Sequence, residues 1–312
     1  MNITLKQLSI LEAIVEKLSY TEAAKSLFMT QPAVSMQIKQ MELQVGMPLF
    51  DRDGKRVTPT QTGTELLYYA QNIRQQLEEA SEMIEELKGM KRGKLHLTMA
   101  STANYFAPQL IAAFHQEFPA AQVTLDVSNR RGLLDALDNN ITDMVIMGRP
   151  PQNKKINGIP FIDNPLVVIA APSHPLAKRE HIPLAEVADE HFIVREADSG
   201  TRIAVERFFA KHDLQLITGM EMNRSEAIKQ AVMAELGLGI VSLHTIEMEL
   251  ALKRLNILNV EDFPIMRQWH IVHRTGKRFA AIPEAFKNFV LQHAKELIDI
   301  TPINNPSSME NT

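Results

Sequence analysis

Apolar positions near the N-terminus recur with the three- and four-residue spacing of amphipathic helices. A first helix is predicted from about residue 4 to residue 18. Two shorter helices follow, because Ser19 and Glu22 have the spacing of a capping box, and Thr30 and Pro32 are typical of a helix start. Two short helices with a tight turn between them predict a helix-turn-helix. The residues expected to face its core are Leu8, Leu11, Ile14, Val15, Leu18, Ala23, Ala24, Leu27, Val34, Ile38, Met41 and Val45.

The outward face of the last of these helices carries amides, a hydroxyl group and a cation, with no carboxylate before Glu42. Such a face can hydrogen-bond base edges in a major groove without repelling phosphate. Any amphipathic helical hairpin would show the same periodicity, but the close pair Ala23-Ala24 and the cap-turn-cap spacing favour DNA binding. The residues of this helix predicted to contact DNA are Gln31, Pro32, Ser35, Met36 and Lys39.

A strong hairpin signal, Asp53-Gly54, follows between the apolar residues Phe50 and Val57 and predicts a small β-wing. Cations on the wing would neutralise phosphates beside the groove. Simple solvation of surface cations is the alternative. The wing residues predicted to contact DNA are Arg52, Lys55 and Arg56.

A long helix, capped by Thr60 or Thr62, is predicted over residues 61–88. Its apolar residues alternate in steps of four and three, which makes a heptad seam. The same helix of a second chain is the simplest partner for so narrow a seam, and packing within one chain is the alternative. Dimerisation would set two reading helices about one turn of DNA apart, as an interrupted inverted repeat requires. The seam residues are Leu66, Ala70, Ile73, Leu77, Ala80, Ile84 and Leu87.

The pattern changes after residue 88, from one long helix to alternating strands and helices. Gly89 and Gly93 predict a hinge at residues 89–93. The alternation over residues 94–300 predicts a largely parallel sheet in each of two lobes, residues 94–162 with 267–300 and residues 163–266. The tail, residues 301–312, is expected to be disordered. Strands are predicted near residues 94–99, 123–127, 143–147, 166–170, 192–194, 219–222, 240–243 and 269–272, and helices near residues 107–118, 133–137, 201–210, 226–236 and 282–297.

Polar residues directly follow several of these strands, at the carboxyl edge where open α/β sheets bind ligands. Residues 199–202 open a helix with hydroxyl groups, free amides and a guanidinium, which suits an anion. Helix capping alone would explain Ser101 and Ser199, but three converging polar loops favour a small polar ligand. The residues predicted to bind it are Ser101, Thr102, Asn104, Ser128, Asn129, Arg130, Gly148, Arg149, Ser199, Thr201, Arg202 and Asn223.

Composition narrows the class of protein. A chain of 312 residues with 45% hydrophobic and 22% charged residues is long enough for two or three ordinary globular domains. Its net charge of −4 requires that any DNA affinity come from a local basic surface. The lack of cysteine excludes disulfides, thiol catalysis and thiolate metal sites. We find neither a signal segment nor an apolar run of membrane length, which predicts a cytoplasmic protein without a membrane partner.

Enzymatic motifs are incomplete in this sequence. Gly237 and Gly239 make only a fragment of a dinucleotide fingerprint, and they follow a predicted helix where a strand is required. The sequence contains neither a phosphate-binding P-loop nor a nucleophile elbow. His270 and His273 are three residues apart on a predicted strand and would face opposite sides, which makes them a poor metal pair. We therefore expect no catalysis, no metal and no cofactor.

The segment TEAAKSLFMTQPAVSMQIKQME resembles the DNA-binding signature of the LysR-type transcriptional regulators. Later segments resemble, more narrowly, the LysR-type regulators of Calvin-cycle (RuBisCO) operons, and the resemblance runs from Leu5 to about Val290. These segments are STANYFAPQLIAAFHQEFP, MGRPP, PLVVIAAPSHPLA, SGTR, RFFAKH, EAIKQAVMAELGLGIVSLHT and HRTGKRF.

The resemblance implies an α+β multidomain protein with an N-terminal winged helix-turn-helix over residues 1–60. A long linker helix and a two-lobed α/β effector domain, similar to periplasmic binding proteins, would follow. It also implies a dimer of dimers, a transcriptional activator that meets RNA polymerase, and an effector that is a phosphorylated metabolite such as ribulose bisphosphate, or NADPH. Arg130, Arg149 and Arg202 suit a phosphate chemically. One departure is the sequence from Asn223 to Ser225, where the resemblance leads us to expect the smaller Gly-Ser-Asn.

Three other readings of the sequence remain to be tested. A LysR-type regulator of another metabolic operon would bind a different small anion. A solute-binding transport protein shares the two-lobed form, but it requires export and has no use for residues 1–60. A DNA-binding enzyme would turn over a nucleotide or a sugar phosphate.

Overall fold

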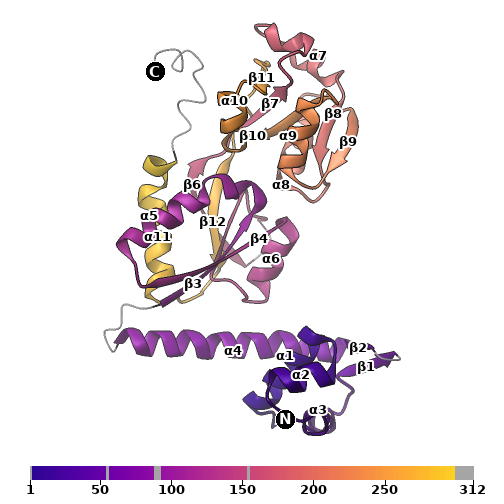
Figure 1. The fold of residues 1–312 in the computed structure, drawn as a ribbon, viewed down its shortest axis with the longest axis vertical. Helices are drawn as coiled ribbons and strands as arrows, with labels where there is room; N and C mark the ends of the chain where they lie inside the picture. Colours follow the sequence, from indigo (N-terminus) through magenta and orange to yellow (C-terminus); the bar gives the residue numbers. More distant parts are fainter. Residues whose placement is uncertain (1, 54–55, 88–92, 153–154, 299–312) are drawn as a thin grey trace. The chain divides into compact units, whose positions relative to one another are not determined.

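The computed structural model describes residues 2–53, 56–87, 93–152 and 155–298 (Figure 1). The helices and strands divide into an N-terminal unit, from α1 to α4, and a C-terminal unit, from β3 to α11. Residues 89–92 of the predicted hinge and the whole of the predicted tail, residues 301–312, lie outside the described residues. No helix of the described part of the chain is long and apolar enough to cross a membrane.

The N-terminal unit begins with the three predicted helices. Ser19 accepts a hydrogen bond from the Glu22 amide (3.4 Å), but the Glu22 carboxylate binds Lys25 and leaves the capping box half formed. Thr30 stands at the start of the third helix without a side-chain cap hydrogen bond. The helices are α1 (Leu5–Lys17), α2 (Tyr20–Ser26) and α3 (Gln31–Val45).

One hydrophobic cluster joins these helices, and nearly all of its predicted members are buried or partly buried. Leu18 is the exception, since the chain leaves α1 there in a left-handed conformation (φ 50°) and the side chain is more than half exposed. Ile10 and Ala13 are buried without having been predicted. Their burial widens the apolar face of α1 beyond the predicted stripe.

A two-stranded antiparallel wing follows, formed by β1 (Phe50–Asp53) and β2 (Arg56–Pro59). Its turn residues, 54 and 55, lie outside the described residues. Thr60 then caps the long helix α4 (Gln61–Leu87), because its hydroxyl accepts a hydrogen bond from the Gly63 amide (3.0 Å).

The predicted seam of α4 is divided between two environments. Leu66 and Ala70 pack into the cluster of the helix-turn-helix, and Arg74 binds Glu12 of α1 (2.9 Å). Further along the seam, Leu77 is 50% and Ile84 is 52% exposed within the chain. Packing within the chain therefore explains only the first part of the seam.

Two five-stranded mixed sheets form the C-terminal unit, one in each lobe (Figure 1). In lobe I the strand order is β4-β3-β5-β12-β6. Strands β4, β3 and β5 pair in parallel, and β12 runs antiparallel to both of its neighbours, β5 and β6. Largely parallel sheets were predicted: four strands of each sheet run in one direction, and one strand, β12 in lobe I and β7 in lobe II, runs against its two neighbours. The strands of lobe I are β3 (Gly93–Ala100), β4 (Ala121–Ser128), β5 (Met144–Met147), β6 (Ile156–Asp163) and β12 (Gln268–Arg274).

Strand β6 was not predicted from the sequence. Gly158 and Pro160 lie within it, and both residues normally argue against a strand. They are tolerated because β6 is an edge strand, where an N–H group on the open side needs no partner.

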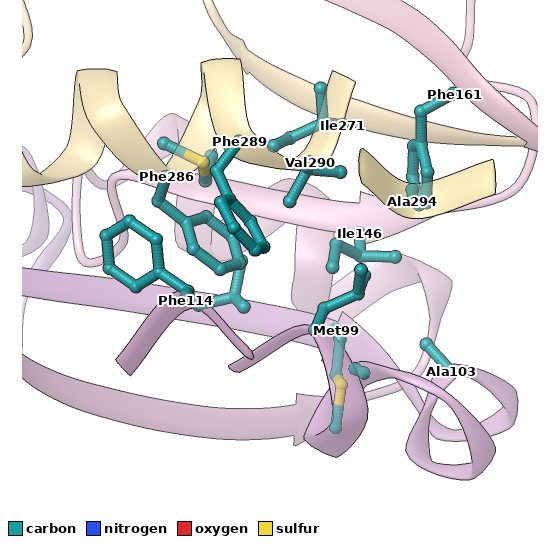
Figure 2. Packing of buried hydrophobic residues seen from close by; sticks show 14 of the residues in the cluster. Met99, Ala103, Phe114, Ile146, Phe161, Ile271, Phe286, Phe289, Val290 and Ala294 are labelled. Atoms are coloured by element: carbon teal, nitrogen blue, oxygen red, sulfur yellow. The ribbon is translucent and has the colours of Figure 1, made fainter. Parts of the chain in front are cut away.

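Helices cover both faces of the lobe I sheet. Phe114 of α5 packs edge-to-face against Phe286 and Phe289 of α11, with ring centroids 5.1 and 5.6 Å apart (Figure 2). Leu133 and Leu137 of α6 pack on the opposite face. The helices are α5 (Ala107–Glu117), α6 (Arg130–Asp138) and α11 (Ala281–Leu297), and a short 3-10 helix, η1 (Ser101–Tyr105), follows β3.

Lobe II repeats this arrangement, with the strand order β11-β7-β10-β8-β9. Strands β7 and β10 are buried throughout, which explains the uninterrupted apolar run of β7. The strands are β7 (Leu166–Ala170), β8 (Phe192–Arg195), β9 (Thr218–Met222), β10 (Leu238–Ser242) and β11 (Asn256–Ile257). The helices are η2 (Pro175–Lys178), α7 (Leu184–Ala188), α8 (Gly200–Lys211), α9 (Ser225–Met233), η3 (Leu243–Thr245) and α10 (Glu247–Ala251).

The chain crosses between the two sheets twice, and the two crossing segments pair with each other. The amide of Asn164 donates to the carbonyl of Arg267 (2.7 Å), and its side-chain oxygen accepts from Ser242 (2.7 Å). Leu166 and Ile265 form a β-bridge beside them. This pairing places the start of β12 next to the carboxyl edge of the parallel strands.

Candidate DNA-reading surface and effector site

The predicted reading residues lie on the outer side of α3. Gln31, Pro32, Met36 and Lys39 are exposed, and Ser35 is half-buried. The Gln31 amide donates a hydrogen bond to the Ser35 hydroxyl (2.8 Å), one helical turn away. The pair holds an amide and a hydroxyl group in a fixed relation, as hydrogen-bonding to a base edge requires.

The wing places two of its predicted cations on facing strands. Arg52 is opposite Val57, and Arg56 is opposite Asp53. Lys55 lies outside the described residues. Contact between these three residues and phosphate stays a prediction.

A recess of about 40 Å³ between the two lobes gathers most of the predicted effector residues. The recess forms because the loops after β3, β4 and β5 meet the start of α8. Ser199 caps α8 by accepting a hydrogen bond from the Thr201 amide (3.2 Å). The predicted residues that line this recess are Ser101, Thr102, Ser128, Asn129, Arg130, Gly148, Ser199 and Thr201.

Two further groups of the recess were missed from the sequence, Arg267 and Trp269. A Cβ atom on Gly148 would lie 2.2 Å from Nη2 of Arg267, so the guanidinium lies directly on this glycine. The indole N–H of Trp269 is buried and has no hydrogen-bond partner among the described residues. Both residues lie at the start of β12, which runs antiparallel to its neighbour. The amino end of such a strand shares an edge with the carboxyl ends of the parallel strands.

A larger cavity of about 1130 Å³, rich in cations, adjoins the recess, since Arg130, Gly200 and Arg267 line both. Asp163 is the one carboxylate among the described residues that line it. A hydrogen bond of 2.9 Å from the Arg130 guanidinium to the Arg149 carbonyl orients the first of these cations. The cations are Arg130, Arg149, Arg207, Lys211 and Arg267.

Burial and mutual repulsion lower the pKa values of two of these arginines. Burial lowers the pKa of Arg267 to about 10, and repulsion from Arg130 and Arg207 adds to the effect. Burial also lowers the pKa of Arg130, again with repulsion from Arg207. Like charges held close together in a cavity favour the binding of an anion.

Three predicted effector residues do not reach either cavity. Asn104 and Asn223 are exposed elsewhere, as is Arg224 of the departing segment. Arg202 binds Glu206 (2.5 Å) and Thr218 (3.3 Å) on the side of α8 that faces β9. The period of the helix explains the direction of Arg202.

The side of α8 that lines the large cavity carries Gly200, Ile203, Ala204 and Arg207. Arg202 falls between these positions and points away from the cavity. Arg202 was predicted to lie in the site because it is close to Ser199 along the chain. In the structure the guanidinium from this helix is supplied by Arg207, one and a half turns later.

The two histidines of β12 have different surroundings. His270 lines the large cavity, whereas His273 is buried against the ring of Phe279, with centroids 5.0 Å apart. They do not share a site, and only His270 can meet a ligand of the cavity.

Comparison with known proteins identifies the family. The model of the LysR-family bacterial regulatory helix-turn-helix matches residues 5–64, and that of the LysR substrate binding domain matches residues 88–295. The RuBisCO operon transcriptional regulator of Allochromatium vinosum is 49% identical over 297 residues, which cover 95% of this chain and 98% of that protein.

Two solved structures extend the comparison. The regulatory domain of CcmR from Synechocystis PCC6803, in complex with 2-PG, is 39% identical and covers 65% of this chain and 98% of that chain, with a TM-score of 0.63. Full-length CbnR in complex with its target DNA is 18% identical and covers 93% of this chain and 99% of that chain, with a TM-score of 0.71. The second likeness concerns the fold alone.

The predicted fold class, a winged helix-turn-helix with a linker helix followed by a two-lobed effector domain, is confirmed. The relatives are regulators and not enzymes, as expected from the sequence. The chain belongs to the LysR family of DNA-binding transcriptional regulators and is related to the regulators of RuBisCO operons.

Proposed function

We propose that this regulator controls carbon-fixation (RuBisCO) genes and responds to a phosphorylated metabolite, or NADPH, bound between its lobes. The observation that carries the proposal is the cluster of arginines around Gly148 and Gly200, whose charge is poorly compensated. Two relatives support it. One is named as a RuBisCO operon regulator, and the regulatory domain of another was solved with 2-PG.

The recess supplies complementary groups from both lobes. Arg130 and Arg267 lie close to Gly200 in the first turn of α8, whose free N–H groups and positive dipole end favour an anion. The Trp269 indole can donate to a ligand oxygen, and Ser101 and Thr102 add hydroxyl groups from lobe I. We infer that one anionic group occupies this recess.

A second anionic group would lie in the larger cavity. Arg149 approaches it from lobe I, and Arg207 and Lys211 approach it from α8 of lobe II. A ligand held at both places would contact both lobes and favour one angle between them. Coupling of this kind typically amounts to about 1–3 kcal/mol, enough to alter how a regulator holds DNA without abolishing its affinity.

On the DNA side, we propose that α3 reads an interrupted inverted repeat, with Gln31 and Ser35 contacting bases and the wing cations contacting phosphates. Two dimers would associate in the cytoplasm as a tetramer, and RNA polymerase would be the further partner during activation. The oriented Gln31–Ser35 pair and the DNA complex of the structural relative CbnR support this proposal.

The first prediction tests the anion site. Arg267→Ala is expected to weaken effector binding by about ten- to a hundred-fold, because a charged hydrogen-bond donor is lost from a desolvated site. Arg202→Ala is the matched control, since this arginine points away from both cavities and its removal should leave effector affinity unchanged. Isothermal titration would compare ribulose bisphosphate and NADPH with citrate and benzoate.

Both variants should bind the operator like the wild type when no effector is present, which controls for misfolding. Equal losses in the two variants would place the anion elsewhere. Tight binding of citrate or benzoate, with no response to any phosphate, would contradict the carbon-fixation assignment and favour a regulator of another operon.

A further inference from the structure

Phe28 is the most exposed large hydrophobic residue of the described chain, with 99% of its surface accessible. It lies in the turn between α2 and α3. The turn is closed by two backbone hydrogen bonds, from the Phe28 amide to the Lys25 carbonyl (3.1 Å) and from the Met29 amide to the Ala24 carbonyl (2.8 Å). These two bonds define a Schellman motif, with Phe28 in the position directly after the helix cap.

That position requires a left-handed backbone, and Phe28 has a φ of 53°. Glycine, or asparagine, usually occupies it, since a bulky side chain is strained there. Burial within the chain does not offset this strain, because the phenyl ring is fully exposed. Neither backbone geometry nor packing within this chain therefore explains a phenylalanine. Strained residues of this kind cluster at functional surfaces.

The location of Phe28 indicates what the ring contacts. It is three residues before Gln31, the first residue of α3, and both Gln31 and Pro32 are exposed. In a helix-turn-helix the amino-terminal residues of the second helix meet the base edges in the major groove. The ring thus lies in the turn that leads directly into the proposed DNA-reading residues of α3.

We propose that the ring of Phe28 contacts the C5-methyl group of a thymine at the edge of each half-site. The thymine methyl is the apolar group that the major groove exposes, and phenylalanine is among the side chains that bind it. Burial of the ring against DNA would offset the strain of the turn. This inference rests on the proposed reading of DNA by α3, and it adds a specificity residue to that surface.

The variant Phe28→Asn distinguishes an effect on DNA binding from an effect on folding. Because asparagine tolerates the left-handed conformation, Phe28→Asn should keep or raise the melting temperature of the full-length protein. The variant should bind an operator selected by the wild type about tenfold more weakly, since each half-site loses a buried ring.

Two control variants accompany it. Leu18→Asn makes the same exchange at another exposed left-handed position and tests the expected effect on stability. Leu43→Ala removes an exposed apolar side chain about 18 Å further along α3 and should leave operator affinity unchanged. Light scattering should show the same oligomeric state for all three variants. A change of oligomeric state in Phe28→Asn alone would identify a protein contact and overturn the proposal.

Deoxyuridine identifies the partner atom, since it differs from thymidine only by the missing methyl group. At the contacted thymine of one half-site, this replacement should weaken wild-type binding about three- to fourfold, the loss for one buried methyl group. Phe28→Asn should show no loss at the same thymine.

The thymine contact would be overturned if deoxyuridine weakened the binding of wild type and variant equally at every thymine. Any DNA contact of the ring would be overturned if Phe28→Asn bound the operator as tightly as the wild type. Ser35→Ala distinguishes a failure of the Phe28 contact from a failure of the proposed DNA reading by α3. If it changes base preference while Phe28→Asn has no effect, only the present inference fails. If neither variant alters binding, the proposed reading surface fails as well.

Discussion

At the scale of single residues, the direction of each side chain decides the chemistry of the cleft. Arg195 is buried beside the recess, but Glu196 neutralises it at 2.8 Å. Arg267 is half-buried in the same recess, and the charges acting on it, Arg130 and Arg207, repel it. Of the two, Arg267 is therefore the one left to bind an anion.

The second prediction concerns the pH dependence of effector binding. His270 lines the large cavity, and burial lowers its pKa. The hydrogen bond of its ring to the Gln268 carbonyl raises the pKa, whereas the positive charges of Arg267 and Arg149 lower it further. A bound anion would neutralise these guanidinium groups and raise the pKa of His270. Since the pKa is then higher in the complex than in the free protein, binding takes up a proton. Affinity should rise as the pH falls through the pKa of the complex, and this dependence should vanish well above it.

Titrations in two buffers of different ionisation enthalpy would measure this proton uptake. His270→Asn removes the histidine but leaves any protonation of the ligand itself, so the difference between the two proteins isolates the contribution of His270. Identical uptake in both proteins would contradict the assignment.

At the scale of elements, Lys229 connects α9 with α10, η3 and η1. Although 2% exposed, its ammonium group has three oxygen partners, Glu226 (2.8 Å), Glu249 of α10 (2.6 Å) and the Thr245 carbonyl (2.9 Å). It also lies 4.8 Å from the ring centroid of Tyr105 in lobe I. Tyr105 in turn donates to Glu226 (3.0 Å), which links the two lobes.

The third prediction is that Lys229→Met lowers the free energy of unfolding by about 3–5 kcal/mol, because one partner of a buried ion pair is removed and Glu249 is left without compensation. Burial alone would lower the pKa of Lys229, but hydrogen bonds to Glu226 and Glu249 raise it, so the amine is charged at neutral pH. Urea unfolding, followed by the fluorescence of the single tryptophan, Trp269, would report on this domain.

Arg131→Ala is the control, since Arg131 and its partner Asp135 are both largely exposed. Its effect should stay within about 0.5 kcal/mol. A loss below about 1 kcal/mol for Lys229→Met would show that the buried network is stabilised in another way.

At the scale of the whole molecule, α4 has more apolar surface than its own chain covers. The helix is about 40 Å long. Its first turns belong to the core of the helix-turn-helix, whereas the seam residues Ile73, Leu77, Ala80 and Ile84 are exposed. The exposed part has the heptad spacing of a helix that pairs with a second copy.

The fourth prediction follows from this open seam. Replacing both Leu77 and Ile84 by glutamate should dissociate the dimer and weaken operator binding, because like charges would face each other in the interface. Sedimentation at micromolar concentration would measure the association state. Gln76→Glu with Ser81→Glu adds the same charge at exposed positions off the seam and should leave the dimer intact. A Leu77→Glu, Ile84→Glu variant that remains dimeric would show that another surface holds the two chains together.

The sequence by itself determined the elements whose signals are local. Caps such as Ser19 and Thr60, the apolar period of α1 and α3, and the hairpin signal of the wing act within a few residues, so they can be read without the fold. The polar loops after β3, β4 and β5 were predictable for a related reason, because the carboxyl ends of parallel strands share one edge.

Tertiary structure decided the features that depend on distant parts of the chain. β6 is possible only because its edge position tolerates Pro160. Arg267 and Trp269 reach the recess because β12 returns antiparallel after lobe II, more than a hundred residues from Ser101. The rotation of α8, set by its packing, turns Arg202 away from the site. Periodicity shows which residues share a face, but strand order and helix rotation decide what that face meets.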